Sequence, residues 1–310
     1  MTGTLKIGAR SSPLSQIQAG LVREALLASH PGLKAELIPI KTTGDMRLDL
    51  PLSRIGVQGV FVKEIEAALL EGTIDLAVHS AKDLPSRLQE GLVLGAVMAR
   101  ADCRDVLISD RPGGLAALPP EARVGTSGLR RQAQLLALRP DLTILSVRGN
   151  VGTRLEKVGG EIEAVLLAAA GLDRLGIQPP HAERLDPDVM LPAVGQGSLA
   201  LEIRRDEPRM AELILPLHHP PSGRILGAER GFLETLGGGC QIPVAALARL
   251  EGDELTLEAL IADPSGERIR RGRKTAPAAG EESAADLGRA LAAELLARGG
   301  DKILSSLTSR

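Results

Sequence analysis

Short apolar runs alternate with longer segments of helical spacing through the first two thirds of the chain. Apolar runs that predict strands fall at residues 5–7, 36–40, 74–78, around 124, at 142–147 and at 164–168. Ser12 and Pro13 predict a helix start, because serine caps helix N-termini and proline suits the first helical position. Apolar side chains then recur at helical spacing as far as Leu26. This alternation predicts α/β layers with a mainly parallel sheet.

Polar loops follow two of these predicted strands. Lys41–Asp45 follows the second strand, and His79–Asp83 follows the third. A helix predicted over Val60–Leu70 lies between them and is closed by Gly72. Ligands of α/β sheets bind beyond the carboxyl ends of the strands. We therefore expect the functional loops to meet at those ends.

The last third of the chain has a different pattern. A helix predicted over residues 222–236 precedes strand-like segments at 243–250, 255–262 and 267–274. The segments Glu251–Asp253 and Asp263–Gly266 have the composition of hairpin turns, which predicts a three-stranded antiparallel meander. Ser283 is predicted to cap a final helix that ends near Gly299.

Proline- and glycine-rich segments predict where one domain gives way to the next. We expect a first lobe from residues 1–98 and 198–216, a second lobe from 103–191, and a C-terminal domain from 220–310. Hinges are expected near 99–103, 192–197 and 216–221. The first two hinges let the chain leave the first lobe, build the second and return.

Composition narrows the class of protein. The chain of 310 residues is 44% hydrophobic, as in globular proteins, and no apolar run reaches the roughly 18 residues of a membrane span. It begins without the apolar core of a signal peptide, and two cysteines do not suggest a disulfide framework, so the cytoplasm is expected. A net charge of −2 and only two aromatic residues argue against a nucleic-acid binder.

Arginines are concentrated in one short stretch. Between residues 130 and 154 the chain carries Arg130, Arg131, Arg139, Arg148 and Arg154, with Asp141 as the only acid among them. Small residues adjoin several of them, which lets backbone N–H groups and guanidinium forks approach an anion together. Ordinary surface ion pairs are the alternative, but the shortage of nearby acids favours a pocket for a molecule with several negative groups. Arg10, at a predicted helix N-terminus, is placed to join it.

Lys82 and Asp83 follow the predicted strand at 74–78. Spacing alone favours the interpretation that Asp83 caps a turn before Leu84-Pro85. The functional alternative is a carboxylate held inside a cationic pocket, where it would stabilise a developing cation or move a proton.

Cys240 follows three consecutive glycines, Gly237–Gly239. The glycines can simply end the preceding helix, and a lone cysteine is usually a small buried hydrophobe. They would nevertheless leave its sulfur accessible. Cys103 has no such setting and is interpreted as structural. No ligand spacing links either cysteine to the histidines, so no metal site is expected.

Five segments together resemble the porphobilinogen deaminase family, also called hydroxymethylbilane synthase. They are residues 79–85, 124–131, 148–154, 191–197 and 238–240. The segments occur in the family order and cover almost the whole chain. The resemblance implies two lobes like those of periplasmic binding proteins, with mainly parallel sheets, and a smaller α/β domain with an antiparallel sheet.

The resemblance also implies a reaction. Four porphobilinogen units are joined head to tail with loss of ammonia, and hydrolysis then releases the linear tetrapyrrole hydroxymethylbilane. The chain grows on a dipyrromethane cofactor, which is bound as a thioether to the position matching Cys240. Cys240 would thus be an anchor during turnover. The implied protein is a monomer that can hand its product to the next enzyme of the pathway.

The family's site residues fall on particular positions of this sequence. Asp83 matches a catalytic aspartate that hydrogen-bonds pyrrole N–H groups and offsets the charge of an azafulvene cation. Positions matching carboxylate-binding residues are Arg10, Ser12, Lys82, Thr126, Ser127, Arg130, Arg131, Arg148 and Arg154. Further contacts to substrate are expected from Arg54, Gln58, Phe61, Ser80 and Gln196.

Some positions depart from the usual family pattern. Arg54 and Gln58 stand where many members have lysine, Gly128 replaces a frequent serine, and Ser198 replaces a frequent alanine. The competing hypothesis is a two-lobed anion-binding protein without chemistry. Cys240 on its glycine loop and Asp83 among cations favour the enzyme over that alternative.

Overall fold

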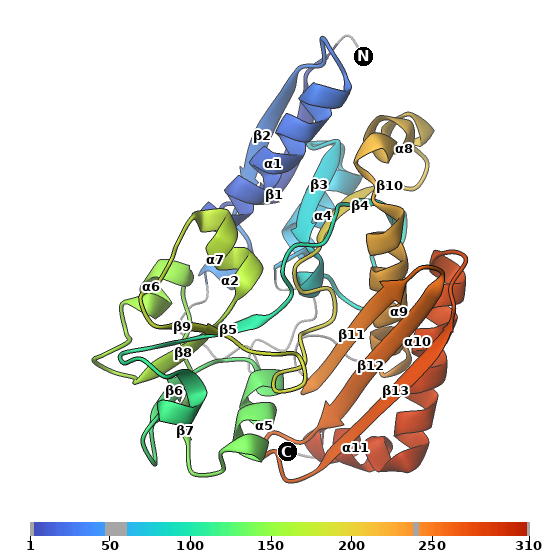
Figure 1. The fold of residues 1–310 in the computed structure, drawn as a ribbon. Helices are drawn as coiled ribbons and strands as arrows, with labels where there is room; N and C mark the ends of the chain where they lie inside the picture. The colour runs from blue at the N-terminus through green and yellow to red at the C-terminus, as the bar shows by residue number, and fades with distance from the viewer. Residues whose placement is uncertain (1–2, 47–60, 238–241, 309–310) are drawn as a thin grey trace.

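Three separate sheets organise the molecule (Figure 1). The computed structural model describes residues 3–46, 61–237 and 242–308. Two five-stranded sheets form the first and second lobes, and a three-stranded sheet forms the third domain. In Figure 1 the first sheet lies at the top, the second at the lower left and the third at the lower right. Among the described residues, no helix is both long and apolar enough to cross a membrane.

The first sheet has the strand order β2-β1-β3-β10-β4. Its strands are β1 (Leu5–Arg10), β2 (Ala35–Ile40), β3 (Leu76–Ser80), β4 (Leu92–Val97) and β10 (Leu199–Arg204). β1 is parallel to β2 and β3, whereas β10 is antiparallel to both of its neighbours, β3 and β4. Four of the five strands therefore run the same way, which confirms a mainly parallel sheet. β10 also shows that the chain returns to this lobe after building the second.

Helices and turns complete the first lobe. They are α1 (Pro13–Ser29), α2 (Thr43–Met46), α4 (Lys63–Leu70), η1 (Ala81–Asp83), α8 (Pro208–Ile214) and η3 (Leu215–Leu217). The segment Lys41–Asp45, interpreted as a polar loop, contains the short helix α2 instead. The helix predicted from Val60 is observed from Lys63, and Val60 lies outside the described residues.

Helix α1 begins as predicted, with Ser12 as N-cap and Pro13 in its first turn. Its apolar spacing did not identify its buried face, because Ile17 and Leu21 are 38% and 42% exposed. The buried face carries Gln18, Ala19, Val22 and Leu26. Gln18 is tolerated there because its amide exchanges hydrogen bonds with the Ser80 hydroxyl, at 2.9 and 3.1 Å.

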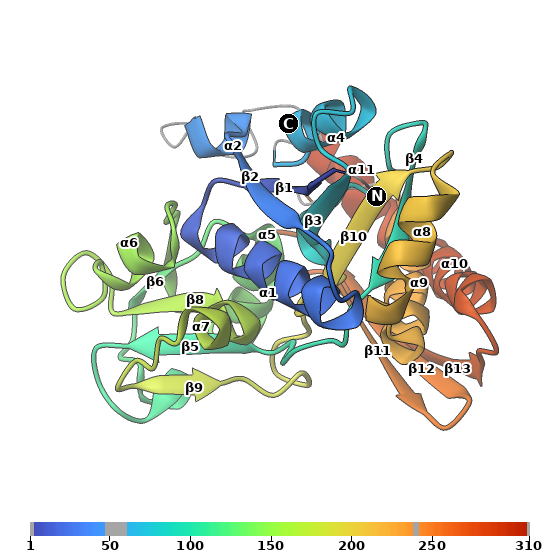
Figure 2. The same ribbon diagram turned by 90° about the horizontal axis from the view of Figure 1, so that it is seen from above.

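The second sheet repeats this arrangement, with the order β7-β6-β8-β5-β9. Its strands are β5 (Asp105–Ser109), β6 (Arg123–Gly125), β7 (Thr143–Leu145), β8 (Ala164–Ala168) and β9 (Ala182–Arg184). β6 is parallel to β7 and β8, and β5 runs against its two neighbours. The helical segments are η2 (Gly114–Ala117), α5 (Leu129–Leu138), α6 (Val151–Leu155) and α7 (Ala169–Leu175). Helix α7 packs against α1 of the first lobe (Figure 2).

The third domain is the predicted meander covered by two helices. It contains α9 (Pro220–Thr235), β11 (Val244–Glu251), β12 (Glu254–Ala262), β13 (Ile269–Pro277), α10 (Glu281–Leu295), η4 (Leu296–Gly300) and α11 (Asp301–Thr308). The three strands pair in sequence and antiparallel, as expected. Helices α9 and α10 cross closely because Gly288 has no side chain; a Cβ there would lie 2.1 Å from the Ala228 carbonyl oxygen.

The helix predicted after Ser283 differs from its prediction at its N-terminal end. Its N-cap is Gly280, and Ser283 lies one turn inside, where its hydroxyl accepts a hydrogen bond from the Gly280 N–H. Its predicted end near Gly299 is confirmed, but a further helix that was not predicted follows. That glycine adopts a φ of +97°, which interrupts the helix, and α11 then continues the chain to Thr308.

The three units meet at one buried carboxylate, Glu229 of α9. It accepts hydrogen bonds from the Arg100 guanidinium at 2.6 Å, the Gly195 N–H at 2.7 Å and the Ala248 N–H at 2.9 Å. Arg100 lies on the crossover into the second lobe, Gly195 on the crossover back, and Ala248 on β11. One side chain therefore holds both crossovers to the third domain.

Replacing Glu229 with glutamine should destabilise the whole molecule. The amide would turn N–H groups toward donors and would leave the Arg100 guanidinium without its counter-charge. We expect a loss of about 3–5 kcal/mol in the free energy of unfolding, the usual cost of breaking a buried pair. Urea unfolding followed by circular dichroism measures it.

Glu282→Gln is the matched control, because Glu282 pairs with Arg289 on an exposed face. That change should cost at most about 1 kcal/mol. Equal stabilities for the Glu229 and Glu282 variants would contradict the central role of Glu229.

Candidate functional site

A cavity of about 770 Å³ lies where the two lobes and the third domain meet. From the first lobe it is lined by the residues after β1 and by η1, and from the second lobe by the N-terminal ends of α5 and α6. The wall is completed by Ala193, Val194 and Gln196–Ser198 of the returning crossover and by Leu233, Ile242 and Val244 of the third domain. The predicted loops at the carboxyl ends of strands thus meet in one place.

The wall of the cavity is strongly cationic. Its cations are Arg10, Lys82, Arg130, Arg131, Arg148, Arg154, Arg174 and Arg230. Among the residues described, only Asp45 and Asp83 supply carboxylates to the same wall. Eight cations against two acids leave an excess of positive charge that a polycarboxylate would balance.

Asp83 lies in this wall on η1, directly after β3. Its Oδ2 is 3.8 Å from Nη1 of Arg10, and its side chain is 30% exposed. The charges of Lys82 and Arg154 also act on it. The geometry therefore matches the functional alternative, a carboxylate among cations.

Arg130 and Arg131 are not short of an acid, which corrects the expectation from the sequence. Asp105, the first residue of β5, is fully buried and pairs with both arginines at 2.7 Å. Burial acts to raise the pKa of the Asp105 carboxyl, but the two guanidinium charges outweigh it and lower the pKa. Asp105 therefore holds two cations at fixed positions in the cavity wall.

Arg139 does not belong to the cavity. It pairs with Asp141 at 2.6 Å on the surface and donates to the carbonyl oxygens of Leu115, Leu118 and Pro119. Asp141, the only acid between residues 130 and 154, therefore pairs with Arg139 and not with the arginines of the cavity.

Burial and neighbouring cations lower the pKa values of Lys82 and Arg154. Burial, together with the charge of Arg131, lowers the pKa of Lys82 to about 8 against the opposing effect of Asp83. Burial and the charges of Arg131 and Arg148 lower the pKa of Arg154 to about 10. Carboxylates entering the cavity would favour the charged forms of both groups.

Of the predicted hydroxyl groups, three line the cavity and one lies behind its wall. Ser12 caps α1, and Ser127 donates to the Val147 carbonyl at 2.7 Å; both line the cavity. Ser80, bonded to Gln18, also lines it. Thr126 is buried behind the wall, where its hydroxyl accepts the Gly128 N–H.

Gln196 joins the returning crossover to the second lobe. Its amide nitrogen donates to the Cys103 carbonyl at 2.8 Å and to Asp105 at 3.2 Å. Its buried amide oxygen has no hydrogen-bond partner within the described part of the chain, although the residue lines the cavity. Phe61 also lines the cavity, with its ring centre 4.1 Å from the Arg10 guanidinium carbon.

Three of the predicted positions lie outside the described residues: Arg54, Gln58 and Cys240. The structure adds residues to the wall that the motifs did not indicate: Gln18, Asp45, Arg174 and Arg230. The sequence offered one indication for Gln18, because it is a polar residue within an otherwise apolar helix face. The sequence offered no such indication for Arg174 and Arg230, since charged residues are common in helices.

Family comparisons cover nearly the whole chain. Residues 5–212 match the family model described as "Porphobilinogen deaminase, dipyromethane cofactor binding domain", and residues 225–297 match "Porphobilinogen deaminase, C-terminal domain". The chain belongs to the porphobilinogen deaminase family. It is therefore an enzyme of tetrapyrrole biosynthesis, a hydroxymethylbilane synthase, with a dipyrromethane cofactor.

Relatives named porphobilinogen deaminase agree with this assignment. The protein of Roseiflexus castenholzii is 50% identical over 98% of this chain and 100% of its own length. That of Nitratidesulfovibrio vulgaris is 48% identical over 98% of this chain and 96% of its own length.

Among solved structures, the BvgS VFT2 domain of Bordetella pertussis is similar at 16% identity with a TM-score of 0.42, covering 69% of this chain and 86% of that one.

The cavity suits the family's cofactor. Each pyrrole ring of dipyrromethane carries acidic side chains, and the wall offers unbalanced guanidinium charge to hold them. Burial is the main cause of the lowered pKa values of Lys82 and Arg154, and carboxylates of a bound ligand would oppose it. The residues present therefore fit the group.

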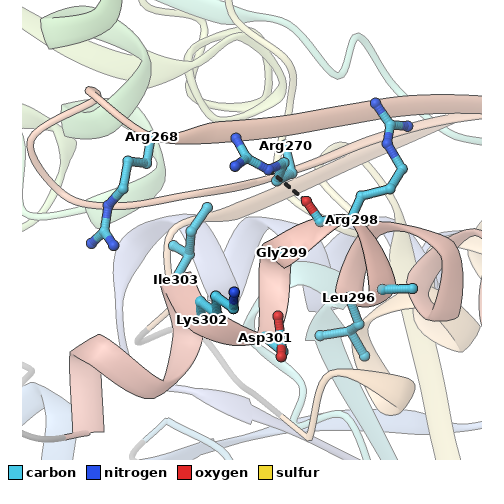
Figure 3. Close-up of a pocket in the computed structure, with 9 residues that line it drawn as sticks. Arg268, Arg270, Leu296, Arg298, Gly299, Asp301, Lys302 and Ile303 are labelled. Carbon is cyan, nitrogen blue, oxygen red and sulfur yellow. Dashed lines mark hydrogen bonds between the residues drawn. The ribbon is translucent and has the colours of Figure 1, made fainter.

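A second cavity, of about 510 Å³, lies far from this chemistry in the third domain, between β13 and the break before α11 (Figure 3). Its cations are largely engaged. Arg268 pairs with Asp263 at 2.8 Å, Arg270 donates to the Arg298 carbonyl at 2.7 Å, and Arg298 reaches Glu294. We assign it no part in the reaction.

Asp105→Asn should weaken the folded state at neutral pH by about 3–5 kcal/mol, because two buried guanidinium groups lose their counter-charge. The folded-state pKa of Asp105 is lowered, so the stability it contributes is present above about pH 4 and is lost as pH falls below that value. The variant should therefore lose less stability than the native chain on acidification. Urea unfolding at a series of pH values measures both effects. If the free energies of unfolding of the native chain and of Asp105→Asn changed in parallel with pH, the role assigned to Asp105 would be contradicted.

Proposed function

We propose that this chain joins four porphobilinogen molecules head to tail, each with loss of ammonia, on a dipyrromethane primer attached to Cys240. Hydrolysis then releases hydroxymethylbilane. The observation that carries this proposal is the cationic cavity at the junction of both lobes, with the Asp83 carboxylate in its wall.

The cations bind the acidic arms of the pyrroles. Porphobilinogen carries an acetate and a propionate, so a growing chain accumulates carboxylates that guanidinium forks and hydroxyl groups can hold. The residues assigned this role are Arg10, Ser12, Lys82, Ser127, Arg130, Arg131, Arg148 and Arg154, with Thr126 shaping the loop that presents Ser127. Phe61, Ser80 and Gln196 supply further contacts from the wall. Arg54 and Gln58 remain predictions.

Asp83 is the catalytic residue of the proposal. When porphobilinogen loses its amine as ammonia, the methylene carbon left behind is cationic. The Asp83 carboxylate accepts the pyrrole N–H hydrogen bond and offsets that charge. The dipyrromethane primer supplies the nucleophilic pyrrole carbon, so no protein side chain has to act as nucleophile in elongation.

Cys240 is the proposed anchor by comparison with Cys103, the other cysteine of the chain. Cys103 is partly buried, and burial raises the pKa of its thiol, which disfavours the reactive thiolate. Leu233 and Ile242, described residues on either side of Cys240 in the chain, both line the cavity. The described chain on both sides of Cys240 therefore reaches the cavity that holds the cations.

The domain boundaries belong to the same proposal. Residues 1–98 with 198–216, 103–191 and 220–310 form units that adjust about hinges near 99–103, 192–197 and 216–221 as the product lengthens. Cytoplasmic location, a monomeric state and transfer of product to the next enzyme stay predictions.

Intact-mass spectrometry tests the anchor. The native chain, or the chain after incubation with porphobilinogen, should carry a mass excess equal to two linked pyrroles. Cys240→Ala should lack that excess and show no turnover. Cys103→Ala is the matched control and should retain both.

A native chain that stays unmodified and inactive with porphobilinogen would overturn the proposed function. It would favour a two-lobed anion-binding protein instead. Normal turnover by Cys240→Ala would overturn the anchor alone.

Asp83→Asn should fold and retain the cationic cavity, because Asp83 makes no short ion pair within the described structure. Its rate of ammonia release from porphobilinogen should fall by about 100-fold or more, since the amide cannot offset a developing cation. Asp110→Asn, which changes a surface pair with Arg111, should retain the native rate. A near-native rate for Asp83→Asn would remove Asp83 from the mechanism.

A further inference from the structure

Arg10 lies between two carboxylates and an aromatic ring. Its Nη2 donates to Asp45 Oδ1 at 2.6 Å, whereas its Nη1 is 3.8 Å from Asp83 Oδ2. The Phe61 ring covers the guanidinium, with 4.1 Å between the ring centre and the guanidinium carbon. The arginine beside the catalytic carboxylate is therefore bonded to a different acid.

Asp45 is held in this position by its own loop. Its Oδ2 accepts hydrogen bonds from the Thr42 hydroxyl at 2.8 Å and from the Thr42 N–H at 3.3 Å. Thr43 is tied in turn to Glu64 of α4 through its N–H at 2.9 Å. Both oxygens of Asp45 are thus occupied, one by the loop and one by Arg10.

The close contact between Gly44 and Phe61 fixes the same loop from the other side. A Cβ at Gly44 would lie 2.1 Å from Cε1 of Phe61, so only glycine leaves room for the ring above Arg10. Asp45, Gly44 and Phe61 together define where the guanidinium can lie.

The ionisation of Asp45 is consistent with this arrangement. Burial acts to raise the pKa of its carboxyl, but the hydrogen bond and charge of Arg10 outweigh burial and lower the pKa. Asp45 is therefore a carboxylate at neutral pH, and it competes with Asp83 for the same guanidinium. Asp45 is the closer partner in the structure: the Arg10 guanidinium is 2.6 Å from the Asp45 carboxylate and 3.8 Å from that of Asp83.

We propose that Asp45 is a positioning residue that holds Arg10 off the catalytic carboxylate. Asp83 then keeps its oxygen lone pairs for the pyrrole N–H groups of substrate. This inference rests on the proposed function, because it concerns the availability of Asp83 in that reaction.

Loss of the Asp45 charge would free Arg10 to move. A shift of about 1 Å brings Nη1 of Arg10 into charge-assisted hydrogen-bond range of Asp83. Among the described residues, the charges of Lys82 on η1 and Arg154 on α6 also act on Asp83. Neither supplies an acid to replace Asp45, so Arg10 would close on Asp83.

Asp45→Asn tests this in the primer-loaded enzyme. We expect kcat to fall by about tenfold, with KM changed by less than about twofold, because a paired Asp83 is less available to the reacting substrate. A raised KM with a native kcat would mean that Asp45 only orders the loop, and would overturn the proposal.

Asp141→Asn is the matched control, since Asp141 also pairs with an arginine at 2.6 Å but on the surface, away from the cavity. It should behave as the native enzyme. Asp45→Ser removes the same charge with a smaller side chain and serves if Asp45→Asn does not fold.

A double-mutant cycle with Arg10→Gln completes the test. If Asp45 acts through Arg10, then Asp45→Asn should lower kcat no further once Arg10 is absent. Additive losses in the double variant would overturn the proposal.

The native chain must first show its primer mass and turnover. Failure there counts against the proposed function, whereas native-like behaviour of Asp45→Asn in a primed, active enzyme counts against the positioning role alone.

Discussion

The buried carboxylate of Glu229 determines how the three units of this enzyme face one another. Each unit has its own apolar packing: one cluster lies on each face of the first sheet, one on each face of the second, and one fills the third domain. Apolar packing is non-directional, so it does not by itself define an orientation between units. Three donors from both crossovers and β11 converge on Glu229, and their directionality supplies that orientation.

The cavity follows from that junction. Its wall takes residues from all three units, so its shape depends on their relative placement rather than on any one core. Smaller apolar contacts support the same placement: Leu226 of α9 packs with Leu84 beside η1, and Ala133 of α5 packs with Leu247 of β11. A carboxylate that anchors both crossovers can thus position a site without contacting substrate.

Inside the cavity, acids of the protein organise the cations. Asp105 holds Arg130 and Arg131, and Asp45 holds Arg10. Pairing gives each guanidinium a defined direction before any ligand arrives, which reduces the ordering that binding must achieve. Among the described residues, the cavity wall still carries more cations than acids. The site is therefore both ordered and short of negative charge, which suits a ligand with several carboxylates.

The sequence by itself determined many of the elements and the family. The alternating pattern predicted β1, β2, β3, β6, β7 and β8, but not β4, β5, β9 or β10. The turns around Gly252 and Gly266 predicted the antiparallel meander, and five motifs in order identified the enzyme family. These features are local, because a strand, a hairpin turn or a motif is written in consecutive residues.

Only the tertiary structure decided which charges meet. Asp105 lies 25 residues before Arg130, and Asp45 lies 35 residues after Arg10, so nothing in the local pattern joins them. The buried face of α1 was decided in the same way, because contact with the sheet and with Ser80 selected Gln18 over Ile17 and Leu21. An ion pair depends on separation in space, and separation in space is set by how the whole chain packs.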